Sequence, residues 1–300
     1  MTPDAQEIIA SWSAPIGVNA SLCLAVLVYA IGWLRLRAGF RELISAWQLA
    51  AFLAGIGSLW IAVGSPVEAF DDVSLTVHML QHLLLMAIAP PLILLSAPTL
   101  PLLQGLPRWM ARSIVAPILR WAWVKRLGHL VTNPAICWLA AALALIGWHI
   151  PAAFELALRS HGWHEFEHAS FFGTGLLFWW PVVQPWPSNA RWPRWSIPLY
   201  LFCATLPCDA LSGFLSFCDR VVYSSYVSAP QILTTSALQD QECAAAMMWT
   251  CITIIFLVPA VIVTIQMLSP KNAPLAGRQM WGGLNRIAGQ SLDSSKPEAN

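Results

Sequence analysis

Apolar residues along this chain gather in long stretches that are separated by short polar segments. Crossing a bilayer's hydrocarbon core as a helix takes roughly 20 apolar residues, because each residue rises only about 1.5 Å. Such a helix satisfies its own backbone hydrogen bonds in lipid, whereas a β-barrel would show short alternating strands. We therefore predict an all-α, polytopic membrane bundle over residues 1–270, with seven transmembrane helices at about 16–34, 46–64, 74–97, 134–151, 164–184, 196–217 and 244–268.

Composition supports this prediction and excludes other classes. The chain is 57% hydrophobic and only 10% charged, whereas a soluble domain has about a quarter of its residues charged. A formal net charge of +1 argues against a nucleic-acid-binding protein, which would carry a basic excess on one face. Residues 1–15 contain no Lys or Arg, so we expect no cleaved signal peptide.

The distribution of basic residues predicts the orientation. One side of the membrane receives 14 of the 16 Lys and Arg residues, and the other side receives only Arg159 and Arg220. The positive-inside rule then places the N-terminus outside and the C-terminus in the cytoplasm. The basic, Trp-containing connection 98–133 is expected to lie at the level of the lipid headgroups, and the tail 271–300 is expected to be partly disordered.

Histidines provide the candidate chemistry, because ionisable groups inside a membrane are costly and usually serve a function. Six of the seven histidines fall at the predicted outer ends of the spans, and only His129 lies in the cytoplasmic connection. Two pairs have i, i+4 spacing, which places both rings of a pair on one helix face. A single pair is often a polar helix face, but two pairs with a fifth histidine at one depth favour a metal site formed by His78, His82, His149, His164 and His168.

Other possible ligands lie at the same level. Met79 follows His78 directly, and the last span begins with Asp240 and continues through Met248. Imidazole together with thioether sulfur favours copper over magnesium or calcium, although methionine also fills apolar cores. The seven cysteines form no Cys-x-x-Cys motif, and a disulfide between Cys218 and Cys243 is one alternative for that pair.

These residues occur in strings that resemble one family. The chain is similar to the CtaG-type cytochrome c oxidase assembly factors, and the resemblance covers most of residues 46–268. The family tends to have glycines after its Asp-Gln pair, whereas this chain has Cys243-Ala244-Ala245-Ala246, which leaves helix packing there and the role of Cys243 open. The strings are His78-Met-Leu-Gln-His82, Ala89-Pro-Pro, Trp148-His149-Ile-Pro, His164-Glu-Phe-Glu-His168, Asp219-Arg220-Val-Val-Tyr223 and Asp240-Gln241.

The resemblance implies a multi-pass protein of the bacterial inner membrane that supplies copper to the oxidase. Its implied partners are cytochrome c oxidase subunits, a periplasmic copper chaperone and membrane lipid, with no nucleic acid. Heme–copper oxidases hold their copper B ion within the membrane nearer the outer face, which matches the depth of the histidines. We accordingly expect no catalysis; copper oxidation state, the oxidase served and homo-oligomerisation stay open.

Three rival interpretations use the same histidines. Membrane di-iron enzymes generally need about eight histidines with adjacent His pairs on the cytoplasmic side, which this chain lacks. A heme-binding protein would need axial ligands from different helices, such as His82 with His168. A copper transporter cannot be separated from a chaperone by sequence.

Overall fold

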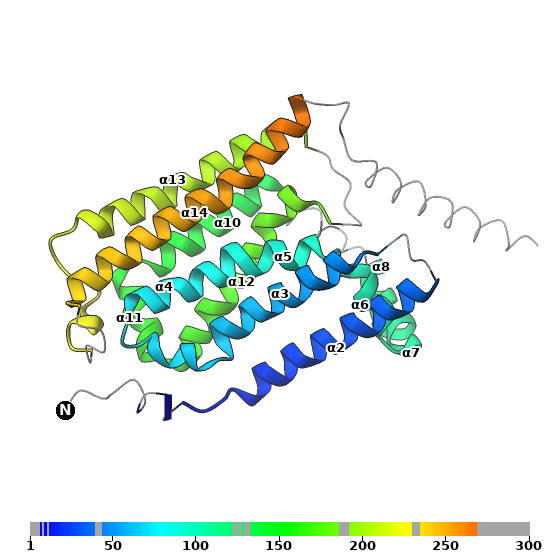
Figure 1. The fold of residues 1–300 in the computed structure, drawn as a ribbon, viewed down its shortest axis with the longest axis horizontal. Helices are drawn as coiled ribbons and strands as arrows, with labels where there is room; N and C mark the ends of the chain where they lie inside the picture. Colours follow the sequence, from blue (N-terminus) through cyan, green and yellow to red (C-terminus); the bar gives the residue numbers. More distant parts are fainter. Residues whose placement is uncertain are drawn as a thin grey trace, which may run out of the picture.

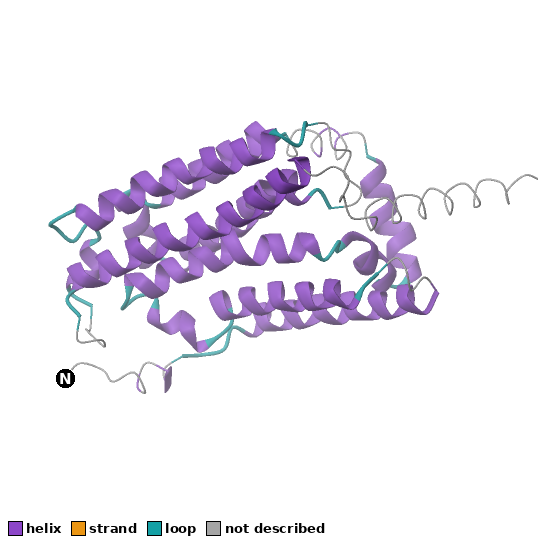
Figure 2. Ribbon diagram, turned by 45° about the horizontal axis from the view of Figure 1, so that its top comes forward, coloured by secondary structure: helices purple, strands orange, loops and turns teal. Residues whose placement is uncertain are grey.

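The computed structural model is a bundle of long helices that run along one common axis (Figures 1 and 2). It describes residues 7, 9–10, 12–39, 44–121, 123, 126, 128, 133–185, 192–229 and 235–268, so His129 and the tail 271–300 lie outside the described residues. Regular structure within these ranges is helical throughout. The long elements are α2 (Ile16–Gly39), α3 (Ala46–Val63), α4 (Leu75–Leu83), α5 (Ala89–Leu95), α10 (Pro134–Trp148), α11 (Pro151–Arg159), α12 (His161–Val183), α13 (Ser196–Phe217) and α14 (Ala237–Leu268).

The described residues support a membrane protein with fewer clear spans than the seven expected. Five helical segments are long and apolar enough to cross a membrane, and α10 with α11 makes a sixth if this pair, bent by 75°, is one span. The expected span 164–184 corresponds to α12, which has 23 residues but begins with a polar turn, HGWHEFEH. The expected span 244–268 begins earlier, because α14 starts at Ala237.

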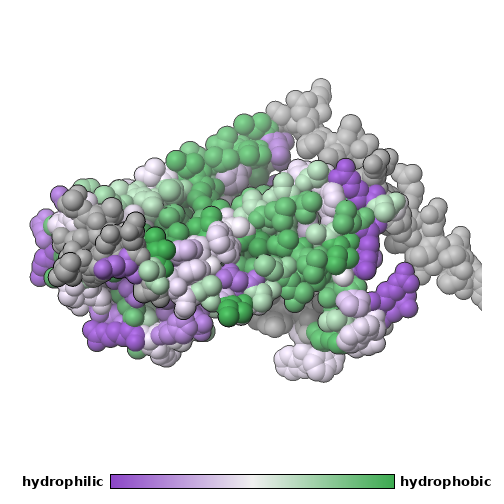
Figure 3. All heavy atoms as spheres, turned by 60° about the horizontal axis from the view of Figure 1, so that its bottom comes forward, coloured by the Kyte–Doolittle hydropathy of each residue, from purple (hydrophilic) through white to green (hydrophobic). Residues whose placement is uncertain are grey.

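The exterior is apolar where a membrane helix would face lipid. Leu24 on α2, Leu143 on α10 and Leu257 on α14 are each more than half exposed. On the face in Figure 3, hydrophobic side chains cover most of the middle of the molecule, and strongly hydrophilic ones lie mainly toward the two ends of its long axis. In water this surface would be unfavourable, so it indicates a lipid environment.

Glycines allow close packing at the end opposite to the N-terminus of α2. There α6 (Thr99–Gly105) lies against α2, and it is followed by α7 (Arg108–Met110) and α8 (Ala116–Arg120). A Cβ on Gly32 would collide with the backbone of Pro101, and one on Gly105 with the backbone of Val28. The start of the basic connection is therefore held against the first long helix by direct backbone contact.

The third expected span is interrupted below its histidine pair. Between α4 and α5 the chain forms one π-helical turn, Leu84–Ile88. Pro90 has no backbone N–H to donate to the carbonyl of Met86, and Nε1 of Trp179 on α12 donates to that carbonyl instead, at 3.2 Å. The side chain from α12 thus stabilises the kink that the Pro-Pro string introduces.

Gly175 brings α12 close to this kink. A Cβ at this position would lie 2.8 Å from the carbonyl oxygen of Met86 and 2.9 Å from Cγ of Pro90. Helix α12 therefore packs against α5 and the π turn with no space for a side chain, which sets the distance between α12 and α4.

We predict that Gly175→Ala destabilises the protein by about 1–3 kcal/mol, because the added methyl group overpacks the contact between α12 and the kink. Thermal unfolding in detergent, followed by tryptophan fluorescence, measures the change. Gly173→Ala is the matched control, since nothing lies within 4 Å of a Cβ at that position. Equal unfolding midpoints for the two variants would contradict the proposed close packing.

Candidate metal centre

Five histidines predicted from separate spans come together at one end of the bundle. His78 and His82 lie on α4, His164 and His168 on α12, and His149 is the C-cap residue of α10. Ring centroids are 4.4 Å apart for His78 and His82, 4.1 Å for His164 and His168, and 5.9 Å for His82 and His149. The structure thus brings all five predicted ligands into one cluster.

The cluster is shielded from solvent by apolar and aromatic side chains. His78 is fully buried, and the exposed fractions of His82, His149 and His168 are 4%, 5% and 7%. Phe154 of α11 packs against His78 with ring centroids 4.9 Å apart, and Phe171 of α12 packs against His82 at 4.2 Å.

A buried carboxylate completes the cluster. Glu167 is fully buried, with Oε1 3.4 Å from Nε2 of His82 and Oε2 3.9 Å from Nε2 of His78. Sequence analysis missed this residue, although the string His164-Glu-Phe-Glu-His168 contains it. Helical spacing could have identified it, because Glu167 lies at i+3 from His164 and so shares its helix face. Glu165 points outward, and its side chain is 66% exposed.

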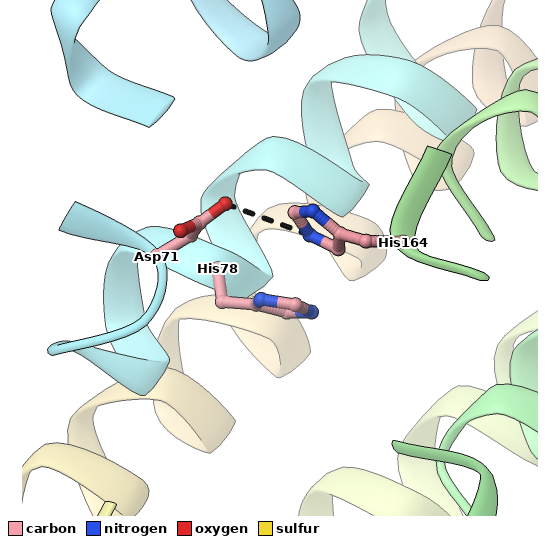
Figure 4. Close-up of side chains that lie close together, drawn as sticks. All are labelled: Asp71, His78 and His164. Carbon is pink, nitrogen blue, oxygen red and sulfur yellow. Dashed lines mark ion pairs between the residues drawn. The ribbon is translucent and has the colours of Figure 1, made fainter. Parts of the chain in front are cut away.

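A second carboxylate approaches from the loop before α4. Figure 4 shows Asp71 beside His78 and His164, with Oδ2 of Asp71 3.5 Å from Nε2 of His164. Asp71 lies outside the spans, where burial, together with the neighbouring carboxylates of Asp72 and Glu68, raises the pKa of its carboxyl to about 8. Asp71 was not among the predicted ligands.

Most donor atoms of the cluster lack a hydrogen-bond partner. The unpartnered atoms are both ring nitrogens of His78 and of His82, Nε2 of His164 and of His168, and both carboxylate oxygens of Glu167. Buried polar groups are normally hydrogen-bonded, so each exception requires an explanation. Here the atoms that lack partners are all metal-ligand types.

The spacing of these donors fits a bound cation. Two ligand atoms at about 2.1 Å from one ion at a tetrahedral angle lie about 3.4 Å apart, which is longer than most hydrogen bonds. Two sets of three donors lie within 4.8 Å of one another and share His78: His78 with His82 and Glu167, and His78 with His164 and Asp71. Each set could hold one metal ion without a large rearrangement of its side chains.

Two of the expected auxiliary ligands, Met79 and Met248, lie close to the histidines. Sδ of Met79 lies 3.3 Å from Nε2 of His149, so this methionine joins the cluster. Met248 is buried and lines a small cavity of about 40 Å³ that Met79, His82 and His149 also line. Its sulfur therefore faces the same space from α14.

Asp240, the third expected auxiliary ligand, contacts the start of α4. Its carboxylate accepts hydrogen bonds from the backbone N–H groups of Leu75 and Thr76, at 2.6 and 3.3 Å, and from the hydroxyls of Ser74 and Thr76. These are the free N–H groups at the start of α4, where a negative charge also complements the helix dipole. Asp240 caps the helix that carries His78 and His82.

The loop before α14 positions two backbone segments of the cluster. Tyr223 donates its hydroxyl to the backbone carbonyl of His149 at 3.2 Å, and Tyr226 donates to that of Asp71 at 2.7 Å. Cys218 and Cys243, which flank this loop, are both free, so the alternative of a disulfide between them is wrong. Hydrogen bonds, and not a covalent link, hold the loop on the cluster.

Together the fold and the site define a helical membrane protein with a buried histidine–carboxylate centre. The family model for the cytochrome c oxidase caa3 assembly factor (Caa3_CtaG) matches residues 27–269. The chain belongs to this family, which confirms the resemblance seen in the sequence strings.

Three curated relatives come from mycobacteria and are described as uncharacterized proteins. Those of Mycobacterium bovis and Mycobacterium tuberculosis are each 23% identical over 266 residues, and that of Mycobacterium leprae is 25% identical over 268 residues. Each alignment covers 83% of this chain and 38% of the relative, so the chain spans about two fifths of their length. No solved structure matches the chain.

We predict that Asp240→Ala lowers stability by about 1–2 kcal/mol and leaves metal binding by the purified protein intact, because it removes a helix cap and not a ligand. Thermal unfolding and metal analysis in detergent measure both effects. Glu242→Ala, on the exposed side of the same helix, is the control. Loss of metal from Asp240→Ala at unchanged stability would instead show that Asp240 is a ligand.

Proposed function

We propose that this oxidase assembly factor binds copper at the histidine–carboxylate cluster and passes it to cytochrome c oxidase. Copper is here the cargo that the protein handles. The observation that carries the proposal is a group of buried, unpartnered donors on α4 and α12: both ring nitrogens of His78 and of His82, Nε2 of His168, and the carboxylate of Glu167. Imidazole-rich sites suit copper, and the neighbouring thioether of Met79 adds to that preference.

Cluster depth supports delivery to a membrane-embedded acceptor. We infer seven spans, counting α10 with α11 as one and α12 as another, in the bacterial inner membrane with the N-terminus outside. The cluster then lies near the outer face, at the start of α4 and α12. Because no phosphate-binding loop occurs in the sequence, transfer would follow a gradient of affinity between partners.

An iron-binding protein is the second candidate, and one observation favours it. His78, His82 and Glu167 form a set of two histidines and one carboxylate, which is also the ligand set of non-heme iron oxygenases. Metal analysis therefore has to include iron.

The packing favours a metal ion over a heme. A heme between His82 and His168 needs a flat slot between their rings. The ring of His78 packs 4.4 Å from His82, and the ring of His164 packs 4.1 Å from His168, so neighbouring imidazoles occupy the space beside both.

We predict that the detergent-purified protein takes up about one copper per chain after incubation with Cu(II), and that the double variant His82→Ala/His168→Ala takes up none, since it removes a ligand from each of two helices. His161→Ala is the matched control, because this histidine lies on the same helix but its side chain is 84% exposed. Copper, iron and the optical spectrum are measured together. The same variants are then introduced into cells, where the amount of copper-loaded oxidase is determined.

The outcomes separate the candidates. The proposal is supported if the wild type and His161→Ala bind copper and the double variant does not, and if the double variant also lowers the amount of assembled oxidase in cells. Iron without copper favours the second candidate, and a Soret band favours heme. Equal copper binding by all three proteins would show that the cluster is structural.

Orientation can be tested separately. We predict that green fluorescent protein fused to the C-terminus fluoresces in bacterial cells, whereas alkaline phosphatase fused there is inactive, because the positive-inside rule places this end in the cytoplasm. The reverse pattern would place the cluster at the inner face and contradict delivery at the outer face.

A further inference from the structure

One contact in the cluster joins a nitrogen to a sulfur, and its hydrogens can be assigned. Nδ1 of His149 lies 2.7 Å from the backbone carbonyl oxygen of Leu145, which can only accept a hydrogen bond. Nδ1 therefore carries the hydrogen, and in a neutral imidazole Nε2 then holds a lone pair. That lone pair faces Sδ of Met79 at 3.3 Å.

Two electron-pair donors thus face each other in a buried position. A thioether sulfur has no hydrogen to donate, so no hydrogen bond joins the two atoms in this tautomer. Protonating both ring nitrogens would place a positive charge among apolar side chains, which is costly. Met79 is fully buried and His149 is 5% exposed, so water does not resolve the contact.

A metal ion between the two atoms fits their spacing. A nitrogen ligand at about 2.0 Å and a sulfur ligand at about 2.3 Å from one ion lie about 3.5 Å apart at a tetrahedral angle. The observed separation of 3.3 Å is close to this value. Met79 and His149 are therefore arranged as two ligands of one ion.

We propose that Met79 and His149 form a second metal position that is selective for a soft monovalent ion, of the Cu(I) or Ag(I) class. It lies beside the position formed by His78, His82 and Glu167, whose carboxylate favours a harder, divalent ion. The inference rests on the proposed metal-handling function and deepens it, because it assigns the two donor sets to different ions.

The adjoining cavity supports a soft ion. It has a volume of about 40 Å³, and Met79 and His149 line it together with Met86, Met248 and Cys208. Most of the remaining lining is apolar, so a hydrated divalent ion would not be stabilised there, whereas polarisable sulfurs can coordinate a dehydrated soft ion. His82 also lines this cavity and belongs to the other position, so the two positions are adjacent.

The experiment measures two probe ions on the full-length protein in detergent. Ag(I) is the soft monovalent probe, and Co(II), whose visible absorption reports its coordination, is the divalent probe. We expect Met79→Leu to weaken Ag(I) binding by about tenfold or more with Co(II) binding unchanged, and Glu167→Gln to do the opposite. Met247→Leu is the matched control, because this methionine packs on the core outside the cavity lining.

A second measurement follows Met79 in the wild-type protein. With ¹³C-methyl-labelled methionine, the Met79 resonance, identified by its loss in Met79→Leu, should shift on addition of Ag(I) and stay unchanged on addition of Co(II). Because the shift is measured on the wild-type protein, it does not depend on whether a variant folds in the presence of metal.

Failure of the separate soft position can be distinguished from failure of the proposed function. Unchanged Ag(I) affinity in Met79→Leu, or equal loss of both ions in both variants, would overturn the separate soft position. Wild-type protein that binds Co(II) but no Ag(I) would overturn it as well, and would leave the histidine–carboxylate site in place. Wild-type protein that binds neither ion would overturn the proposed function itself.

Discussion

Unpartnered nitrogen and oxygen donors held inside an apolar bundle are the constraint around which this structure is organised. Leaving a buried donor or acceptor without a partner costs about 1–3 kcal/mol, and more for a charged group. His78, His82 and Glu167 combine several such atoms at one place between α4 and α12. A fold that only needed stability would fill this space with apolar side chains, and the proposed metal ion would supply the partners that these atoms lack.

The surrounding contacts hold these donors at ligand distances from one another. Gly175 and Trp179 set α12 against the π turn below the first histidine pair. Asp240 reaches from α14 to cap α4 directly above that pair. Tyr223 holds the backbone at the bend that carries His149. Because these contacts come from different helices, the donor geometry depends on the packing of the whole bundle and not on any one helix.

The chemistry of the donors suits a protein that accepts and releases an ion. The histidine–carboxylate set and the Met79–His149 pair differ in softness, and His82 lies at the boundary between them. Under the proposed function, the protein must bind its ion tightly enough to be specific and loosely enough to release it. Two adjacent donor sets of different softness meet that requirement without an external energy source.

Sequence alone determined the membrane-helix class, the two histidine pairs and the family, because hydrophobic stretches and i, i+4 spacing are local properties. It did not separate Glu167 from Glu165, because the inward face of α12 is set by its packing against α4, although the helical phase contained the signal. Asp240 was assigned as a ligand from its position in the chain, yet only the approach of α14 to α4 decided that it caps a helix. The contact of Met79 with His149 joins residues 70 positions apart. Such a pairing depends on which helices are neighbours in the folded bundle, and no local pattern of the chain encodes that.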